Sequence, residues 1–311
     1  MKGIAKIATQ GLVLLVVFCA CIPCALAETV YLSTFNANTI DRFDSNGNDT
    51  VFATASSGLN YPTGLALDNS GNLYVANSGG SVQGTPTIEE FTPSGTESVF
   101  ASAGLSFPTA LAFDGSGNLF VANSGNNTVV EIAPNGTGSV FATAISGLYY
   151  PAGLTFDPEG DLYVANGNNT ILKFGTNGEV SVFATNGLDN PGGLAWFDGS
   201  LYVVNGVNEI EKFNPSGQGS TFISTNLMNL AIDLAFDSSG NLYVANHGDS
   251  DVLKFTPDGV GSVFASGLAN AVGIAIEDVP EPSTLLLVSL ALPLLFLTRA
   301  VVPSRNGERR P

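Results

Sequence analysis

The chain is built from short apolar runs, each closed by turn-forming residues, and the clearest example lies between residues 234 and 265. Four such runs occur there, and the sequences between them are rich in Gly, Pro, Asn and Asp. Short runs of Val, Leu, Tyr and Phe between such residues are typical of β-strands joined by hairpins. The first two runs, Leu-Ala-Phe-Asp and Leu-Tyr-Val-Ala-Asn, recur with one substitution each from residue 111 and from residue 154. The pattern therefore predicts an all-β protein made of repeated four-stranded units.

Each unit opens at one equivalent position, and the spacing of these positions gives the size of the unit. The positions are Gly64, Ala110, Gly153, Gly193, Asp233 and Gly273, with successive spacings of 46, 43, 40, 40 and 40 residues. A period near 40 residues with four strands per unit is typical of the blades of a β-propeller. The longest spacing contains an expanded loop at residues 78–87, and such an insertion leaves the strand framework unchanged.

The two ends of the repeat region complement one another. The segment that starts at Val30 matches the second strand of the other units and has no first strand before it, whereas Gly273–Glu277 is a first strand with no unit after it. Paired, they complete a sixth blade, and such closure removes the exposed sheet edges that favour aggregation. The sequence thus predicts a six-bladed β-propeller over residues 28–278, with four antiparallel strands per blade and with closure by pairing of N- and C-terminal strands.

Both ends of the chain carry targeting patterns. The N-terminus has a basic start, an apolar stretch at residues 12–22 and an Ala-Leu-Ala sequence, which are the parts of a secretory signal peptide. We expect residues 1–27 to be removed by cleavage between Ala27 and Glu28. The three cysteines all precede that point: Cys19, Cys21 and Cys24. The mature domain therefore has no thiol for a disulfide, a zinc site or a nucleophile.

The C-terminal residues 279–311 carry the second pattern. Pro280, Glu281 and Pro282 precede an apolar run at residues 285–298, which is followed by four arginines. The apolar run can enter a bilayer as a helix, and the arginines keep the tail on the cytoplasmic side. The segment resembles the PEP-CTERM sorting signal. The resemblance implies a Gram-negative bacterium, export through the inner membrane by the secretion machinery, and processing by an exosortase near the motif.

Removal of both ends makes the remaining domain strongly acidic. Six of the 10 basic residues and one of the 27 acidic residues lie outside residues 28–282, which leaves four bases, 26 acids and a net charge of −22. Such a surface repels nucleic acid and anionic lipid, so we expect no nucleic-acid partner.

The repeat unit resembles a known family. Units of the form Pro-x-Gly-Leu-Ala-Phe-Asp-x-x-Gly-Asn-Leu-Tyr-Val-Ala-Asn are similar to NHL repeats, within a group that includes gluconolactonase-like and virginiamycin-lyase-like propellers. The resemblance covers Glu28 to about Asp278 and implies the fold rather than an activity, because propellers serve both binding and catalysis. The calcium ligands of the gluconolactonase-like enzymes cannot be matched here by motif. The lyase-like enzymes use histidine chemistry, and this chain has a single histidine.

Antiparallel strands sort the loops onto two faces. The turns between the first and second strands and between the third and fourth strands share one end, which we call the hairpin face. The loops between the second and third strands share the other end with the segments that join the blades, and we call it the connector face. Its sequences vary more, so we expect it to be the functional face.

Positions that break the repeat are the candidate site residues. Asp233 stands where most units have Gly, and His247, Asp249 and Asp251 occupy a loop of the same unit that elsewhere contains Ser, Gly, Asn and Thr. Three carboxylates and an imidazole can bind a divalent metal, with calcium as the candidate ion, or serve acid–base chemistry. The alternative is that they are solvated loop residues that require no cofactor.

Two sets of recurrent polar residues also have a structural and a functional interpretation. The turn sequence Asp-x-Ser-Gly-Asn occurs at residues 68–72, 114–118 and 237–241, with a variant at 157–161. These residues are the ones that tight hairpin turns use, and calcium binding is the alternative. An asparagine ends the second strand of most units, at Asn77, Asn123, Asn166, Asn205 and Asn246. These side chains either ring the central channel or, as we favour, cap their own loops.

The sequence as a whole predicts an exported, non-enzymatic propeller of the cell envelope, cell surface or extracellular matrix, whose connector face binds a ligand that the sequence does not identify. One alternative is a metal-dependent lactonase- or lyase-like enzyme that uses the cluster around Asp233. Another is a structural component of an extracellular polysaccharide matrix, which the sorting-signal resemblance implies.

Overall fold

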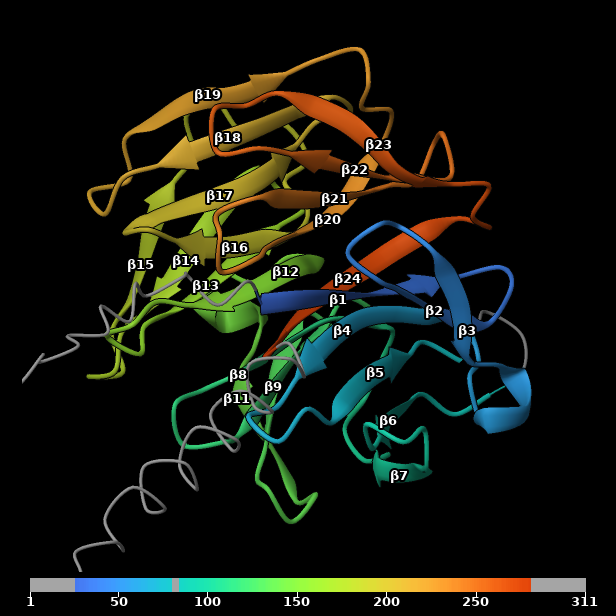
Figure 1. The fold of residues 1–311 in the computed structure, drawn as a ribbon. Coiled ribbons are helices and arrows are strands. Elements are labelled where there is room, and N and C mark those ends of the chain that lie inside the picture. The colour runs from blue at the N-terminus through green and yellow to red at the C-terminus, as the bar shows by residue number, and fades with distance from the viewer. Residues whose placement is uncertain (1–25, 80–83, 281–311) are drawn as a thin grey trace, which may run out of the picture. The chain divides into compact units, whose positions relative to one another are not determined.

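The structure, a computed structural model, describes residues 26–79 and 84–280, and these form six four-stranded sheets around a central axis (Figure 1). Blade A contains β24 (Ala271–Pro280), β1 (Leu26–Thr34), β2 (Thr39–Phe43) and β3 (Asp49–Ala53). Blade B contains β4 (Pro62–Leu67), β5 (Leu73–Asn77), β6 (Thr87–Phe91) and β7 (Glu97–Ala101). Blade C contains β8 (Pro108–Phe113), β9 (Leu119–Asn123), β10 (Thr128–Ile132) and β11 (Gly138–Ala142).

The other three blades follow the same order from the axis outward. Blade D contains β12 (Pro151–Phe156), β13 (Leu162–Asn166), β14 (Thr170–Phe174) and β15 (Val180–Ala184). Blade E contains β16 (Leu194–Phe197), β17 (Ser200–Asn205), β18 (Glu209–Phe213) and β19 (Gly219–Ser224). Blade F contains β20 (Ala231–Phe236), β21 (Leu242–Asn246), β22 (Asp251–Phe255) and β23 (Gly261–Ser266). Short 3₁₀ turns η1 (Ala55–Ser57) and η2 (Ala144–Ser146) follow two of the outer strands.

The predicted fold class is confirmed: the described residues form an all-β, six-bladed propeller of antiparallel sheets. A compact unit spans Ala27–Val279. In the part of the chain that the structure describes, no helix is long and apolar enough to cross a membrane. Most of the expected signal peptide, the sorting residues Glu281 and Pro282, and the expected C-terminal hydrophobic helix lie outside the described residues.

The hydrophobic core is divided into six clusters, and each lies between two neighbouring blades. All five residues of β5 are buried, as they are in β9, β13 and β21, because the second strand of each blade is covered on both faces. Between blades A and B, for example, Tyr31 and Ile40 pack with Leu73, Val75 and Phe91. A sheet covered on both faces has continuous rather than alternating apolar residues, as the sequence shows. No blade can therefore bury its apolar surface without both neighbours.

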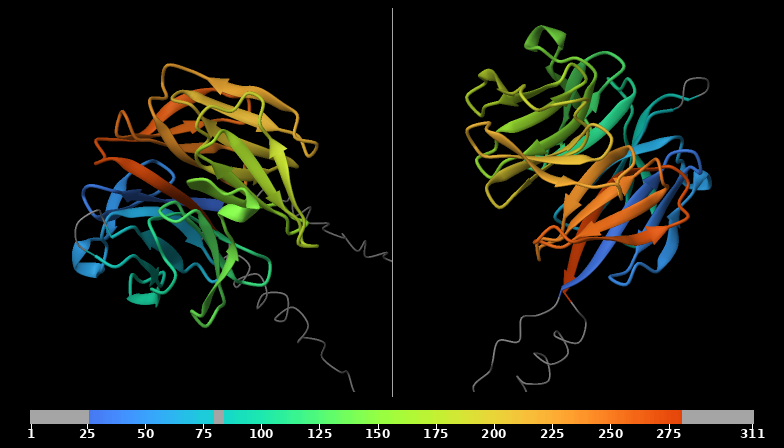
Figure 2. Two further views of the ribbon diagram at one scale, coloured as in Figure 1. Left: turned by 180° about the vertical axis from the view of Figure 1, so that it is seen from behind. Right: turned by 90° about the horizontal axis from the view of Figure 1, so that it is seen from above.

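The ring closes where β24 pairs with β1, which joins the two ends of the chain within blade A (Figure 2). The Ser33 hydroxyl of β1 accepts a hydrogen bond from the Gly273 N–H of β24 at 2.7 Å and donates to the Thr63 carbonyl of blade B at 2.5 Å. This group is fully buried. The predicted closure by pairing of the terminal strands is confirmed.

Closure also uses side chains that reach from blade F to β1. The Lys254 ammonium forms an ion pair with the Glu28 carboxylate at 2.7 Å, and the Tyr243 hydroxyl donates to the same carboxylate. The Lys254 ammonium also lies over the Tyr243 ring, 4.7 Å from its centroid. The N-terminal strand is thereby attached to the blade that precedes it around the ring.

We predict that a chain ending after Val272 will lose much of its unfolding free energy, whereas a chain ending after Asp278 will retain it. The shorter chain lacks the inner strand of blade A, which exposes an unpaired edge, and folded domains have only about 5–15 kcal/mol in total. Urea unfolding of the two chains measures the difference. Equal midpoints would contradict closure by β24.

Candidate functional site

The six inner strands surround a channel whose middle is lined by aliphatic side chains. They are buried and form what we call the leucine ring: Leu65, Leu111, Leu154, Leu194, Leu234 and Ile274. On the connector side of this ring lies a chamber of about 80 Å³, which Gly64, Ala110, Gly153 and Asp233 also line. A Cβ added at Gly64 would lie 2.6 Å from the Thr109 carbonyl oxygen, so the close approach of neighbouring inner strands leaves no room for a side chain there. A chamber of this size holds a few water molecules.

Asp233 provides the single acidic side chain among the residues that line the chamber. Its Oδ1 accepts a hydrogen bond from the Leu234 N–H at 2.9 Å, and its Oδ2 accepts one from the Ile274 N–H of β24 at 3.1 Å. Burial raises the pKa of Asp233 to about 6, although the two N–H groups favour the carboxylate. Asp233 thus links blade F to the closing strand.

His247 also contacts the start of the closing strand. Its Nδ1 lies 3.1 Å from the Ala271 carbonyl, and its Nε2 lies 3.2 Å from the Asn270 amide nitrogen. These contacts fit a neutral ring that donates from Nδ1 and accepts at Nε2. The Asn270 amide oxygen in turn accepts a hydrogen bond from the Asn36 side chain at 2.8 Å. We call Ser33, Asp233, His247, Glu28 and Lys254 the closure cluster.

The other two candidate metal ligands are bound to asparagines. Asp249 accepts a hydrogen bond from the Asn229 amide at 2.9 Å, and Asp251 accepts one from the Asn246 amide at 2.7 Å. Burial raises the pKa of Asp251, and the nearby Asp249 charge raises it further. Among the described residues, no group of three or more His, Cys, Asp or Glu side chains could hold a metal ion. The structure therefore does not gather Asp233, His247, Asp249 and Asp251 into a metal site, and calcium binding stays a prediction without a ligand set.

The aspartates of the hairpin turns cap their own turns. Asp68 Oδ1 accepts hydrogen bonds from the Ser70 and Asn72 N–H groups, and Oδ2 accepts one from the Asn72 amide. Asp114 makes the equivalent three contacts with Ser116 and Asn118. The interpretation as hairpin chemistry is confirmed for these turns.

The recurrent asparagines join each blade to the segment that precedes it. Asn123 is fully buried; its Oδ1 accepts a hydrogen bond from the Ser106 N–H at 3.1 Å, and its Nδ2 donates to the Gly104 carbonyl at 3.0 Å. The same amide also donates to Thr128, which opens the next strand of its own blade. Equivalent contacts to connector N–H groups occur at Asn77, Asn166, Asn205 and Asn246. The asparagines therefore do not ring the channel: they hold both a loop and an interblade connector.

The connector face presents large apolar side chains at strained backbone positions. One residue near the end of each connector has φ between 46° and 58°, directly before the inner strand in five blades and before Pro191 in blade E: Tyr61, Phe107, Tyr150, Asn190, Leu230 and Asn270. Such a conformation is rare for non-glycine residues and costs about 1–3 kcal/mol each. Phe107 is 46% exposed and Tyr150 56%, and the Tyr149 ring lies edge-on to Tyr150 at 4.9 Å. We define the connector patch as Tyr61, Phe107, Tyr149, Tyr150, Leu227 and Leu230, all of which are exposed.

Hydrogen bonds from neighbouring loops hold these strained residues in place. The Tyr150 N–H donates to the Asn127 side chain at 2.6 Å, and the Tyr61 N–H donates to Asn38 at the same distance. The Phe107 carbonyl accepts a hydrogen bond from the Ser124 N–H. With the backbone fixed in this way, the aromatic rings are held toward solvent. In the sequence, this patch could have been recognised from the aromatic residue that stands before a proline in three of the connectors.

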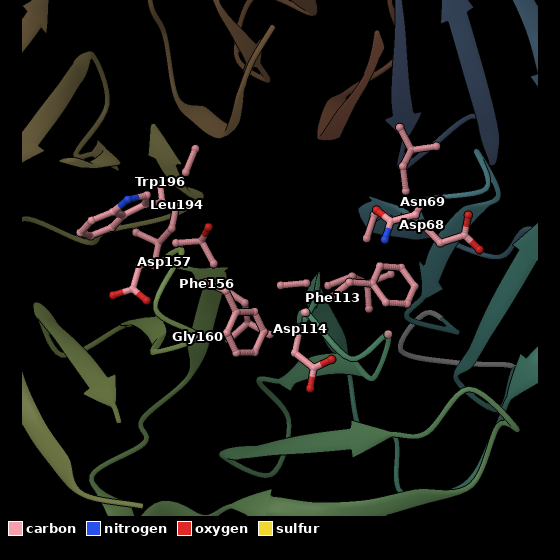
Figure 3. Close-up of a pocket in the computed structure, with 18 of the residues that line it drawn as sticks. Asp68, Asn69, Phe113, Asp114, Phe156, Asp157, Gly160, Leu194 and Trp196 are labelled. Carbon is pink, nitrogen blue, oxygen red and sulfur yellow. The ribbon is translucent and has the colours of Figure 1, made fainter. Parts of the chain in front are cut away.

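A large cavity opens on the opposite, hairpin face. It has a volume of about 1160 Å³, and the five leucines of the leucine ring lie at its base. Aromatic residues from the ends of the inner strands line it, and acidic turn residues lie at its edge, as Figure 3 shows for Phe113, Phe156, Trp196, Asp68 and Asp114. We call this space the hairpin-face cavity. The sequence favoured the connector face alone and did not indicate this cavity.

Comparison with known proteins agrees with the architecture. The NHL repeat family matches residues 59–81, and no curated protein matches the chain in sequence. A chain of a nidogen/laminin complex is 19% identical with a TM-score of 0.70, over 80% of this chain and 98% of that chain. Virginiamycin B lyase from Staphylococcus aureus is 16% identical with a TM-score of 0.59, over 78% and 85%. A gluconolactonase from Xanthomonas campestris is 19% identical with a TM-score of 0.61, over 71% and 84%.

These likenesses define the class of protein. The chain contains an NHL repeat and folds as the six-bladed propeller that its structural neighbours share. The neighbours include a lyase, a lactonase and a member of a binding complex. At identities below 20% the likeness extends to the fold and not to an activity.

We predict that Asp233 makes stability depend on pH. The pKa of Asp233 is about 6 in the folded protein, above the ordinary 3.8. The contribution of Asp233 to the unfolding free energy is therefore most favourable below pH 3.8 and is lost as the pH rises through about 6. Relative to Asp233→Asn, which keeps an acceptor and removes the charge, the wild type should lose roughly 1–3 kcal/mol between about pH 4 and about pH 7.

Urea unfolding at several pH values measures this effect, with Asp258→Asn as the control for an exposed carboxylate in the same blade. The control should follow the wild-type pH dependence. Parallel curves for Asp233→Asn and wild type would contradict the assignment.

Proposed function

We propose that the protein is an exported binding protein of the cell envelope and that the connector patch is its binding surface. The observation that carries this proposal is the set of exposed aromatic rings fixed on strained backbones. Strain of this kind persists where the surrounding structure holds it, and it concentrates at ligand-binding positions. Aromatic side chains that are rigid before binding lose little conformational entropy, and they dominate the energetics of interfaces.

The distribution of charge on the domain indicates which classes of partner the connector face can bind. The four basic residues of the propeller lie in third strands, and each lies over an aromatic ring of its own blade: Arg42, Lys173, Lys212 and Lys254. None belongs to the connectors or their neighbouring loops. The connector face therefore offers aromatic, amide and acidic groups, which disfavours nucleic acid and anionic lipid as partners.

Attachment at the opposite face supports display of the connector patch. The β1 strand runs from the hairpin face to the connector face, and β24 runs in the reverse direction, so both chain ends leave the propeller at the hairpin face (Figure 2). A tail that enters the inner membrane would hold the hairpin face toward it. The connector patch would then point away, whether the protein stays attached or is released by an exosortase.

The enzymatic alternative has one observation in its favour, the carboxyl of Asp233 with a pKa of about 6 in the channel. A chamber of about 80 Å³ is, however, much smaller than the roughly 300–1,000 Å³ of typical ligand pockets. Both oxygens of Asp233 also accept backbone hydrogen bonds. Binding is therefore the function that the geometry supports better.

We predict that Phe107→Gly and Tyr150→Gly will weaken binding to envelopes of the source organism without destabilising the fold. Glycine relieves the strain at positive φ, which offsets its greater unfolded-state entropy, so the unfolding free energy should change by less than about 1 kcal/mol. Loss of an aromatic anchor should lower the affinity roughly 10- to 30-fold. Val140→Ser, at an exposed apolar residue of the outer strand β11, is the control and should bind normally. Unchanged binding by both glycine variants would contradict the proposal.

We further predict that protein isolated from the native envelope starts at Glu28 and ends between Val279 and Thr284. Intact-mass measurement tests both ends. A polypeptide that still carries residues 285–311 would show that the tail is a retained anchor. A polypeptide that still carries residues 1–27 would contradict the signal-peptide assignment.

A further inference from the structure

The hairpin-face cavity lies at the opposite end of the channel from the connector patch and plays no part in the function proposed above. Its volume of about 1160 Å³ is slightly larger than the roughly 300–1,000 Å³ of typical small-molecule sites. Blades B to F contribute to its lining. The five leucines of the leucine ring line its base, and the chamber beyond them, of about 80 Å³, is too small for an organic ligand.

Aromatic rings on the cavity wall are fixed by contacts to neighbouring rings. Phe113 lies edge-on to Tyr74 at 5.0 Å, and Trp196 stacks on Tyr163 at 5.2 Å. Phe236 stacks on Phe197 at 4.4 Å, with an angle of 10° between the rings. Because these rings are packed between blades, a ligand would meet a wall whose shape is already set.

The charged residues that line the cavity are all acidic. The lining includes Asp68, Asp114, Asp157 and Glu159, and no Lys, Arg or His occurs in it. Asp157 has a partial counter-charge, because the Lys173 ammonium lies at 3.8 Å while making a closer contact with Asp161 at 2.7 Å. Asp68 and Asp114 accept hydrogen bonds only from uncharged groups of their turns, which fix the carboxylates without neutralising them.

From this combination we infer that the hairpin-face cavity binds organic cations with an apolar, aromatic-sized body. The apolar body would pack against Phe113, Phe156 and Trp196, where cation–π attraction adds to the burial of apolar surface. The fixed carboxylates would attract the positive charge and repel an anion of the same shape. The inference rests on the cavity alone, so its test is independent of binding at the connector patch.

The chain contains its own reporter for this site. Trp196 is the single tryptophan of the sequence and it lines the cavity. Its fluorescence therefore reports binding at this cavity even when the full chain, with its apolar tail, is studied in a non-ionic detergent. Trp196 also lines a smaller pocket with Tyr163 and Lys173, so variants at a residue that lines the larger cavity alone must assign the signal. Tetraphenylphosphonium and tetraphenylborate are suitable probes, because they share one size and shape and carry opposite charges.

Gly115 offers a matched pair of variants at the edge of the cavity. A Cβ there meets nothing within 4 Å, and its backbone does not need glycine, so a longer side chain fits without strain. Gly115→Lys places a positive charge at the lining, and Gly115→Gln adds a polar side chain of similar length without the charge. Equal melting temperatures of the two variants establish that both are folded.

The expected result is a saturable change in Trp196 emission with tetraphenylphosphonium, at concentrations at least tenfold lower than any change with tetraphenylborate. Gly115→Lys should weaken binding of the cation roughly three- to tenfold, and Gly115→Gln should leave it within about twofold of wild type. Equal responses to both probes, no saturable response, or equal effects of the two Gly115 variants would each overturn the inference.

Discussion

The requirement that every blade be covered on both faces governs the whole molecule. Each of the six apolar clusters lies between two blades, so an open ring would leave two sheet faces exposed to water. Six connectors join successive blades through the chain itself, and the last leads from blade F into β24. Blade A alone is assembled from both chain ends, so its inner strand must also be held against β1. The closure cluster meets this need, because Asp233 and His247 contact β24 while Lys254 contacts β1 through Glu28.

Much of the architecture can be predicted from the sequence, because the same strand and turn pattern recurs in every blade. The spacing from Gly64 to Gly273 gives the number of blades, and the unpaired segments at the two ends give the closure. The turn aspartates were also interpreted correctly, since Asp68 and Asp114 have the residue spacing that a hairpin cap requires. These features depend on contacts that are local or that repeat regularly.

The candidate site could not be predicted in the same way. Asp233 and His247 were recognised as departures from the repeat, but a departure does not show whether a residue meets a ligand or a neighbouring strand. The answer depends on β24, which lies some forty residues further along the chain at Ile274 and next to Asp233 in the ring. The positive φ of Tyr150 and the size of the hairpin-face cavity likewise arise from the packing of several blades, which no local pattern records.

The two ends of the channel have different chemistry, and the leucine ring lies between them. The connector face carries exposed aromatic rings on strained backbones, whereas the hairpin face has a recessed cavity with aromatic walls and fixed carboxylates. The chamber beside Asp233 is too small to join them into one passage for organic ligands. One propeller thus presents two separate surfaces, and closure of the ring positions both.

Hydrogen–deuterium exchange of the backbone amides in β24 tests ring closure most directly. If β24 is an integral inner strand, the amides of residues 273–277 exchange as slowly as those of the equivalent strands β8 and β12, and they open only with the whole domain. Fast exchange in residues 273–277 alongside full protection of β8 and β12 would contradict the account, because the ring would then be open in solution.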